Sequence, residues 1–154
     1  ESAMANPFEP ADLGDGGIRH EVNVFVFRWE NAVPQYLLVK PEPKHEGLWR
    51  PVIQPIFLNE DFSAAALRGV REETGLHGAP DLVAPRGAGI EDIGDLRLVG
   101  WPFGYFHAGA SQEPATRPSI ADYSWDSFEM AILALDSRVH RQNLLRIHDR
   151  LTAA

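Results

Sequence analysis

Two stretches near the start of the chain have the hydrophobic pattern of paired β-strands. Residues 20–29 alternate between two sets of side chains, and over 22–27 both sets are apolar apart from one asparagine. One face carries Val22, Val24 and Val26, and the other carries Asn23, Phe25 and Phe27. Branched and aromatic residues on both faces are typical of a strand inside a sheet. Residues 30–34 break this run and residues 35–40 resume it, so the two strands are expected to form a hairpin.

One helix is expected in the middle of the chain. Asp61 or Ser63 can cap its start, the alanines that follow favour a helix, and Gly75 stands where helices commonly end. Its buried stripe is expected to contain Phe62, Ala66, Leu67 and Val70.

The remaining segments alternate between extended and helical patterns. Residues 49–53 are typical of a short extended segment that Pro55 limits, because proline cannot donate a hydrogen bond to a sheet. Residues 80–94 are rich in turn residues, and residues 96–108 have the aromatic character of one bent strand or two. A strand is expected at 120–125, and helices are expected at 127–135 and 138–151.

This order of elements predicts an α/β fold in which helices cover a mixed sheet. We expect a single domain from residue 18 to residue 154. Residues 1–17 are rich in Pro, Gly, Asp and Ala and are expected to form an irregular arm. Its first three residues, which precede Met4, resemble a cloning remnant.

Composition narrows the class of protein. A chain of 154 residues can bury a substantial core, and the absence of cysteine excludes disulfides and thiolate metal sites. The formal net charge of -8 disfavours binding to a nucleic acid polymer, so an RNA-binding adaptor is a remote alternative. No stretch is apolar enough to cross a membrane, and we expect a cytoplasmic protein. The oligomeric state cannot be read from the sequence.

Acidic residues gather on one face of the expected central helix. Glu72 and Glu73 are adjacent, and Arg68 lies four residues before Glu72, within side-chain reach along the helix. Position 69 shares the face of both glutamates. Clustered carboxylates repel one another unless a cation lies between them, and their hard oxygens suit Mg²⁺ or Mn²⁺.

Residues 54–76 resemble the Nudix box, the signature of the Nudix hydrolase superfamily, G-x5-E-x7-R-E-U-x-E-E-x-G-U with U aliphatic. Both spacers match without gaps. The matching residues are Glu60, Arg68, Val70, Glu72, Glu73, Gly75 and Leu76. Gly47-Leu48-Trp49 before the box, and residues 125–131 followed by a helical tail, are similar to the bacterial nucleoside-triphosphate pyrophosphatase branch.

The resemblance implies a Nudix-type α/β/α sandwich around a mixed sheet. It also implies hydrolysis of a diphosphate linkage in a nucleoside-diphosphate derivative with Mg²⁺ or Mn²⁺. Glu72, Glu73 and Arg68 would be the catalytic residues, Arg68 by orienting the glutamates, and Glu72, Glu73 and Glu60 would hold the metal ion. The substrate would be bound by Lys40, Arg50 and Trp49.

The chain departs from the Nudix pattern at three places. Gln54 stands in place of the first glycine of the box, and Gly69 stands in place of the glutamate after Arg68, a principal metal ligand in the family. Near Ser119 and Ile120 a glutamate-histidine pair of this branch is also missing. A substitute base could come from Glu91, Asp92, Asp95 or Asp122.

These departures leave two functions open. The first is a Nudix hydrolase with weak activity. The second is a Nudix-fold module that binds a nucleotide or regulates without turnover. The aromatic residues of 101–106 and the six histidines are expected to be structural, because no histidine pair has metal-ligand spacing.

Overall fold

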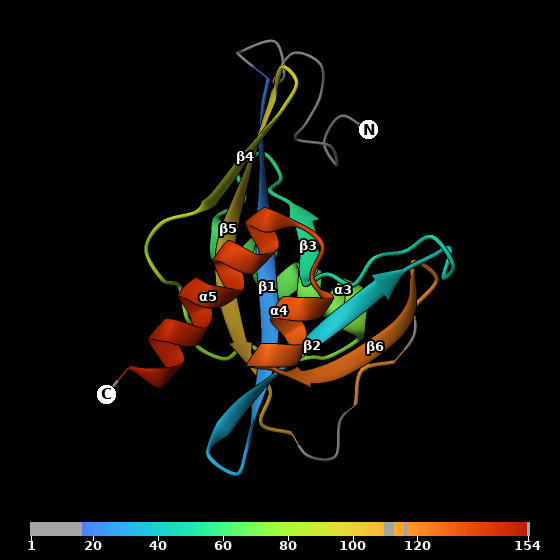
Figure 1. The fold of residues 1–154 in the computed structure, drawn as a ribbon, viewed down its shortest axis with the longest axis vertical. Helices are drawn as coiled ribbons and strands as arrows, with labels where there is room; N and C mark the ends of the chain where they lie inside the picture. Colours follow the sequence, from blue (N-terminus) through green and yellow to red (C-terminus); the bar gives the residue numbers. More distant parts are fainter. Residues whose placement is uncertain (1–16, 110–112, 116, 154) are drawn as a thin grey trace.

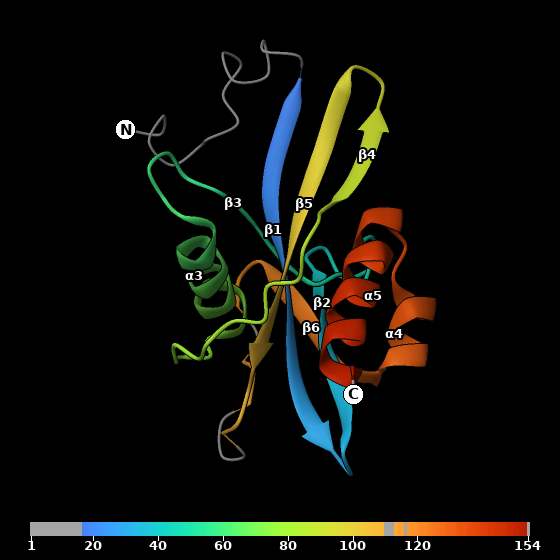
Figure 2. The same cartoon turned by 90° about the vertical axis from the view of Figure 1, so that its left-hand side faces the viewer.

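A six-stranded sheet forms the middle layer of the protein, with helices on both of its faces (Figures 1 and 2). This computed structural model describes residues 17–109, 113–115 and 117–153, so the expected arm lies almost wholly outside the described residues. The strands are β1 Ile18–Glu30, β2 Val33–Pro41, β3 Val52–Pro55, β4 Gly89–Ile93, β5 Leu96–Phe106 and β6 Ile120–Ser127. The helices are α3 Phe62–Thr74, α4 Phe128–Ala134 and α5 Arg138–Thr152.

Strand β1 organises the sheet, whose order is β4-β5-β1-β2-β6. It pairs in parallel with β5 along one edge. Its other edge is divided, because residues 21–24 pair with β3 and residues 27–30 pair with β2. Only one isolated bridge, Val39 to Arg50, is described between the segments of β2 and β3, so the sheet splits at this point. The segment just before β3 contacts the last turn of α3, where Arg50 donates to Glu73.

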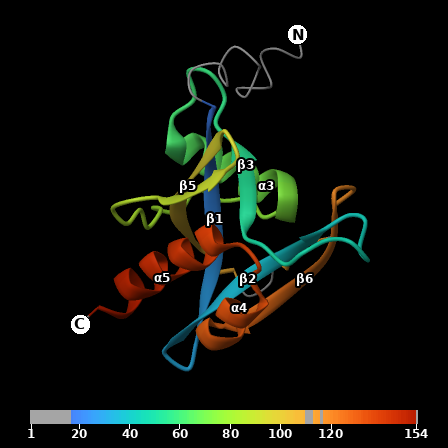
Figure 3. The same ribbon diagram turned by 45° about the horizontal axis from the view of Figure 1, so that its top comes forward.

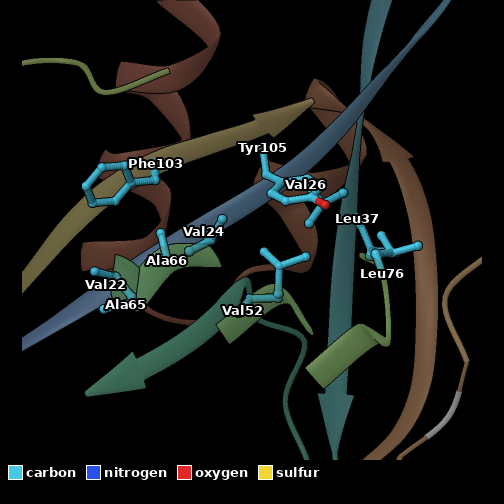
Figure 4. Close-up of a cluster of buried hydrophobic side chains, with 11 residues drawn as sticks. Val22, Val24, Val26, Leu37, Val52, Ala65, Ala66, Leu76, Phe103 and Tyr105 are labelled. Carbon is cyan, nitrogen blue, oxygen red and sulfur yellow. The ribbon is translucent and has the colours of Figure 1, made fainter. Parts of the chain in front are cut away.

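The alternation predicted for β1 is confirmed, because its two faces enter two separate cores. Val22, Val24 and Val26 pack with Ala65 and Ala66 of α3 (Figure 4). Val70 of α3 belongs to the same cluster. Phe25 and Phe27 pack on the opposite face with side chains of α4 and α5. Helix α3 therefore covers one face of the sheet, whereas α4 and α5 cover the other (Figure 2).

Each helix begins at a side chain that accepts a backbone hydrogen bond. Asp61, Ser127 and Ser137 are the N-caps of α3, α4 and α5. Such caps satisfy an amide that has no partner within the helix. Helix α5 contacts β4 and β5, and α4 contacts β2 and β6 (Figure 3). The three predicted helices are thus confirmed to within one or two residues.

Two expectations about local structure were wrong. Residues 89–93, expected to be turns, form edge strand β4, which pairs with β5 through the tight turn at Gly94 and Asp95. The extended segment expected at 49–53 ends at Pro55 as predicted, although the strand begins only at Val52. The second error concerns the buried stripe of α3. Phe62 is 37% exposed and lies against Trp101 instead of entering the core.

Among the described residues, no helix is both long and apolar enough to span a bilayer.

Candidate functional site

Helix α3 presents the two adjacent glutamates to different surroundings. Its buried face is formed by Ala65, Ala66 and Val70, and Gly75 ends it with a positive φ of 77°. Successive positions on a helix point about 100° apart. The side chain of Glu72 is 54% exposed, whereas that of Glu73 is 6% exposed. Glu73 faces β3, and Glu72 faces solvent.

Arg68 joins α3 to the segment that precedes it. Its Nε and Nη2 donate to the two carboxylate oxygens of Glu60 at 2.9 and 3.1 Å. Its Nη1 donates to Oε1 of Gln54 at 2.8 Å, and its Nη2 donates to the carbonyl of Pro55 at 2.7 Å. The hydrogen bonds from Arg68, with smaller effects from the backbone amide of Phe57 and the charge of Arg68, lower the pKa of Glu60. Arg68 therefore fixes residues 54–60, and its contact with Glu72 is the longest of the set at 3.5 Å.

Glu73 is held by an arginine and an amide. Nη1 of Arg50 donates to its Oε1 at 3.0 Å, and Nε2 of Gln54 donates to its Oε2 at 2.8 Å. Burial raises the pKa of Glu73, and the charge of Arg50 and these hydrogen bonds act against that rise. Both oxygens of this carboxylate thus already have donors from the protein.

Gln54 occupies the space beside Gly69. A Cβ atom on Gly69 would lie 2.6 Å from Cγ of Gln54 and 3.1 Å from Cγ1 of Val52. Glycine inside a helix is less stable than alanine by about 1 kcal/mol. The close approach of α3 to β3 explains why a glycine stands there despite this cost.

A cavity of about 390 Å³ lies next to this network. Its lining includes Trp49, Arg50, Ser137 and His140, together with carboxylates from Glu42, Glu46 and Asp136. Nζ of Lys40 lies 4.9 Å from the centre of the Trp49 ring. Burial, with a smaller effect from the charge of Arg50, lowers the pKa of His140 to about 4, so this histidine is neutral at pH 7. Arg50 lines the cavity and also binds Glu73, so it connects the cavity with α3.

Comparison with solved structures decides the fold. The chain is similar to an Ap4A hydrolase from C. elegans in a binary complex, with 16% identity, a TM-score of 0.69, and coverage of 88% of this chain and 99% of that one. It is also similar to the MutT protein of Methanosarcina mazei Go1, with 18% identity, a TM-score of 0.68, and coverage of 91% and 99%. The NUDIX domain of Shewanella oneidensis NrtR, complexed with ADP ribose, has 18% identity, a TM-score of 0.70 and 99% coverage of both chains.

The chain has the Nudix hydrolase fold. The fold predicted from residues 54–76 is therefore confirmed. No family model matches the sequence. No curated protein matches it either.

The carboxylates of the Nudix-fold site already have hydrogen-bond partners within the protein. Each oxygen of Glu73 accepts from Arg50 or Gln54, and both oxygens of Glu60 accept from Arg68. Mg²⁺ requires about six oxygen ligands close to octahedral geometry. In the described parts of the chain, no three His, Asp or Glu side chains are grouped so that they could hold a metal ion. As arranged, these residues do not fit a bound Mg²⁺ or Mn²⁺.

The seven predicted site residues fall into two groups that Glu73 connects. Trp49 and Arg50 line the cavity, and Lys40 lies against the Trp49 ring. Glu60, Arg68 and Glu72 lie around α3 on the far side of Gln54. Glu73 joins the groups through Arg50. The predicted substitute bases lie elsewhere. Glu91, Asp92 and Asp95 lie on β4 and its turn at the sheet edge, and Asp122 pairs with Lys44 at 3.8 Å.

Sequence reasoning missed three polar residues of this region. Gln54 was noted only as a departure, although it binds both Arg68 and Glu73. His140 was assigned no role, yet it lines the cavity. Glu21 was not singled out, and burial raises its pKa while Asn23 donates to it at 3.0 Å and the charge of Arg50 lies nearby. Glu21 lies opposite Pro55 of β3, so the register between β1 and β3 is the information that places it near the site.

Proposed function

We propose that this protein binds a nucleoside-diphosphate derivative in the cavity beside Trp49 and Arg50. The observation that carries the proposal is the position of Arg50, which lines the cavity and binds Glu73 of the Nudix-box helix. A ligand in the cavity would therefore meet a fixed guanidinium. Guanidinium groups bind phosphate oxygens with two parallel hydrogen bonds.

The lining of the cavity suits the two halves of such a ligand. The Trp49 ring can stack a base, and base-aromatic stacking contributes about 1–3 kcal/mol. Lys40 and Arg50 supply positive charge for the phosphates. Glu42, Glu46 and Asp136 also line the cavity, and these carboxylates disfavour ligands with additional negative charge. A diphosphate esterified at both ends, which carries two charges, is therefore preferred over a triphosphate.

The ligands named for similar structures support this ligand class. ADP ribose, in the complex of the NrtR domain, is a nucleoside diphosphate derivative, and Ap4A is the substrate named for the C. elegans hydrolase. Both molecules contain adenosine linked through phosphates. The same chemistry is proposed for the cavity of this chain.

Binding without efficient hydrolysis is the form of this function that the geometry favours. Hydrolysis in the manner implied by the Nudix resemblance needs carboxylates available to a metal ion. Glu73 and Glu60 are engaged by Arg50, Gln54 and Arg68 instead. The protein is thus proposed to act as a nucleotide-binding or regulatory module.

Weak cleavage of the diphosphate linkage with Mg²⁺ or Mn²⁺ is the second candidate function. The observation that favours it is Glu72, whose side chain is 54% exposed on a helix that keeps the Arg68–Glu60 pair of the Nudix pattern. In that case Glu72 and Glu73 would hold the metal after Glu73 is released from Arg50.

Calorimetric titration with ADP-ribose, ADP and ATP tests the binding proposal. We expect saturable binding in the order ADP-ribose, ADP, ATP, and about tenfold weaker binding of ADP-ribose to Trp49→Ala. Trp29→Ala is the matched control, because Trp29 is 44% exposed and does not line this cavity. Absence of binding by all three ligands, or equal effects of the two substitutions, would overturn the proposal.

A turnover assay on the same ligands separates the two candidate functions. We expect no release of AMP above background over hours with Mg²⁺ or Mn²⁺. Metal-dependent turnover that Glu73→Gln abolishes would instead establish the second candidate. Lys40→Ala should weaken ligand binding in either case, because Nζ of Lys40 lies 4.9 Å from the centre of the Trp49 ring, which lines the cavity.

A further inference from the structure

We propose that Arg50 and Gln54 permanently replace a divalent cation at Glu73, and that the residues at positions 54 and 69 have changed together. Compared with the Nudix box, the large side chain is on β3, as Gln54, and the small residue is on α3, as Gly69. The inference concerns the carboxylates of α3 and holds whichever ligand enters the cavity. It predicts a site on the Nudix fold that is complete without metal.

The first step is electrostatic. Glu73 is almost fully buried, and a buried carboxylate requires a cation or several donors. Arg50 supplies a positive charge at 3.0 Å from Oε1, and Gln54 supplies a neutral donor at 2.8 Å from Oε2. The guanidinium of Arg50 also donates to the carbonyl of Pro51 at 2.8 Å, which fixes its orientation. The protein thus provides the contacts that a cation would otherwise make with this carboxylate.

The second step is steric. The resemblance to the Nudix box places a small residue at position 54 and a glutamate at position 69, and this chain has the larger residue at 54 and the smaller one at 69. Gln54 fills the space that a side chain at 69 needs, since a Cβ there would lie 2.6 Å from Cγ of Gln54. Gln54 cannot turn aside without losing its bonds to Glu73 and Arg68. The two departures from the Nudix pattern are therefore one coupled change.

The third step concerns charge. A glutamate at 69 would add another carboxylate beside Glu73 and the nearby Glu21, and the group would need a cation between its members. With glycine at 69, Arg50 pairs with Glu73, and the charges of Arg50 and Arg19 together with a hydrogen bond from Asn23 stabilise Glu21. Glu60 has its own cation in Arg68, and Glu72 is exposed to water. None of these carboxylates requires a metal ion.

Metal titration of the wild-type protein is the direct test. We expect no saturable heat with MgCl₂ or MnCl₂, and the same Tm with EDTA as with millimolar Mn²⁺. Saturable uptake that Glu73→Gln removes would overturn the proposal. This measurement needs no variant to fold, and it is independent of nucleotide binding.

The coupling between positions 54 and 69 is tested by three variants: Gln54→Gly, Gly69→Glu and the double substitution. We expect Gly69→Glu alone to lower the Tm sharply, and Gln54→Gly in the same chain to recover part of that loss. The double variant should also acquire Mn²⁺ binding, detectable as a Tm that rises with MnCl₂. If Gly69→Glu lowers the Tm equally in the wild type and in Gln54→Gly, positions 54 and 69 are not coupled.

Removal of the Arg50 guanidinium provides a second test. Arg50→Met leaves Glu73 buried without its charged partner, so its Tm should rise with Mn²⁺ more than that of the wild type. Arg97→Met is the matched control, because Arg97 forms a bidentate ion pair with Asp92 at the exposed sheet edge. If Arg50→Met and Arg97→Met respond to Mn²⁺ alike, the role assigned to Arg50 is wrong.

Discussion

Asn143 of α5 donates a hydrogen bond of 2.8 Å to the side-chain oxygen of Asn23 on β1, and both residues are fully buried. Asn143 also donates to the carbonyl of Gly100 on β5 at 2.9 Å. Asn23 in turn donates to Glu21 at 3.0 Å. A chain of polar contacts therefore runs from α5 through the sheet to Glu21, a carboxylate that the charge of Arg50 also reaches.

The first prediction is that Asn143→Ala destabilises the protein by about 2–4 kcal/mol. The substitution leaves two buried acceptors, on Asn23 and Gly100, without this donor and opens a cavity. The free energy of unfolding in urea measures the effect. Asp149→Ala, at an exposed position of the same helix, is the control and should change stability by less than about 0.5 kcal/mol. A loss no larger than the control's would mean that water replaces Asn143.

The second prediction concerns Arg68, which the sequence assigned to orienting the glutamates. We expect Arg68→Lys to cost about 2–3 kcal/mol, because an ammonium cannot reproduce the forked bonds to Glu60, Gln54 and Pro55. The amides of residues 57 and 60 should also exchange faster with deuterium.

Arg71→Lys is the matched control for this substitution. It lies on the exposed face of α3, and its exchange profile should equal that of the wild type. Unchanged protection of residues 57–60 in Arg68→Lys would show that this segment is held by other contacts.

The fold was predictable where the signal was local. The alternation in β1 and the caps of α3 depend on residues within one element, and both were confirmed. Strand β4 was missed because its two isoleucines, Ile90 and Ile93, are about half exposed on an edge strand and give no apolar face. The Gly94-Asp95 pair between two aliphatic runs is a hairpin signal that could have located it.

The site was less predictable because its decisive contacts are distant in sequence. The box spacing located Glu60, Arg68, Glu72 and Glu73 on or beside one helix. It could not indicate that Arg50, 23 residues before Glu73, binds that carboxylate. Nor could it relate Gln54 to Gly69, since only the packing of β3 on α3 brings them together. Side-chain competition for one space is a property of tertiary structure.

The third prediction concerns pH. The pKa of His140 is lowered to about 4 by burial and by Arg50, whereas histidine in an unfolded chain has a pKa near 6.5. Between these values the unfolded chain binds a proton that the folded chain does not. Stability contributed by neutral His140 is therefore present above about pH 6.5 and is lost as the pH falls towards 4. The total loss is about 3 kcal/mol.

His140→Gln provides the comparison for this pH dependence. The raised pKa values of Glu21 and Glu73 act in the opposite sense, but they are present in both proteins. The difference in free energy of unfolding between wild type and His140→Gln should thus change between pH 7 and pH 4.5. A constant difference would mean that His140 accepts a proton in the folded state.

The fourth prediction is that the two adjacent glutamates of α3 differ in their effect on stability. Glu73→Ala removes a buried partner of Arg50 and the acceptor of the Gln54 amide, and we expect a loss of about 3 kcal/mol at pH 7. Glu72→Ala removes an exposed group 3.5 Å from Arg68, and we expect a change within about 0.5 kcal/mol. Both substitutions gain similar helix propensity, so this term cancels in the comparison. Urea denaturation of the two variants in the presence of EDTA measures the difference without any contribution from metal. Equal losses of unfolding free energy would imply that Glu73 is as well hydrated as Glu72. The ion pair between Glu73 and Arg50 would then not stabilise the protein.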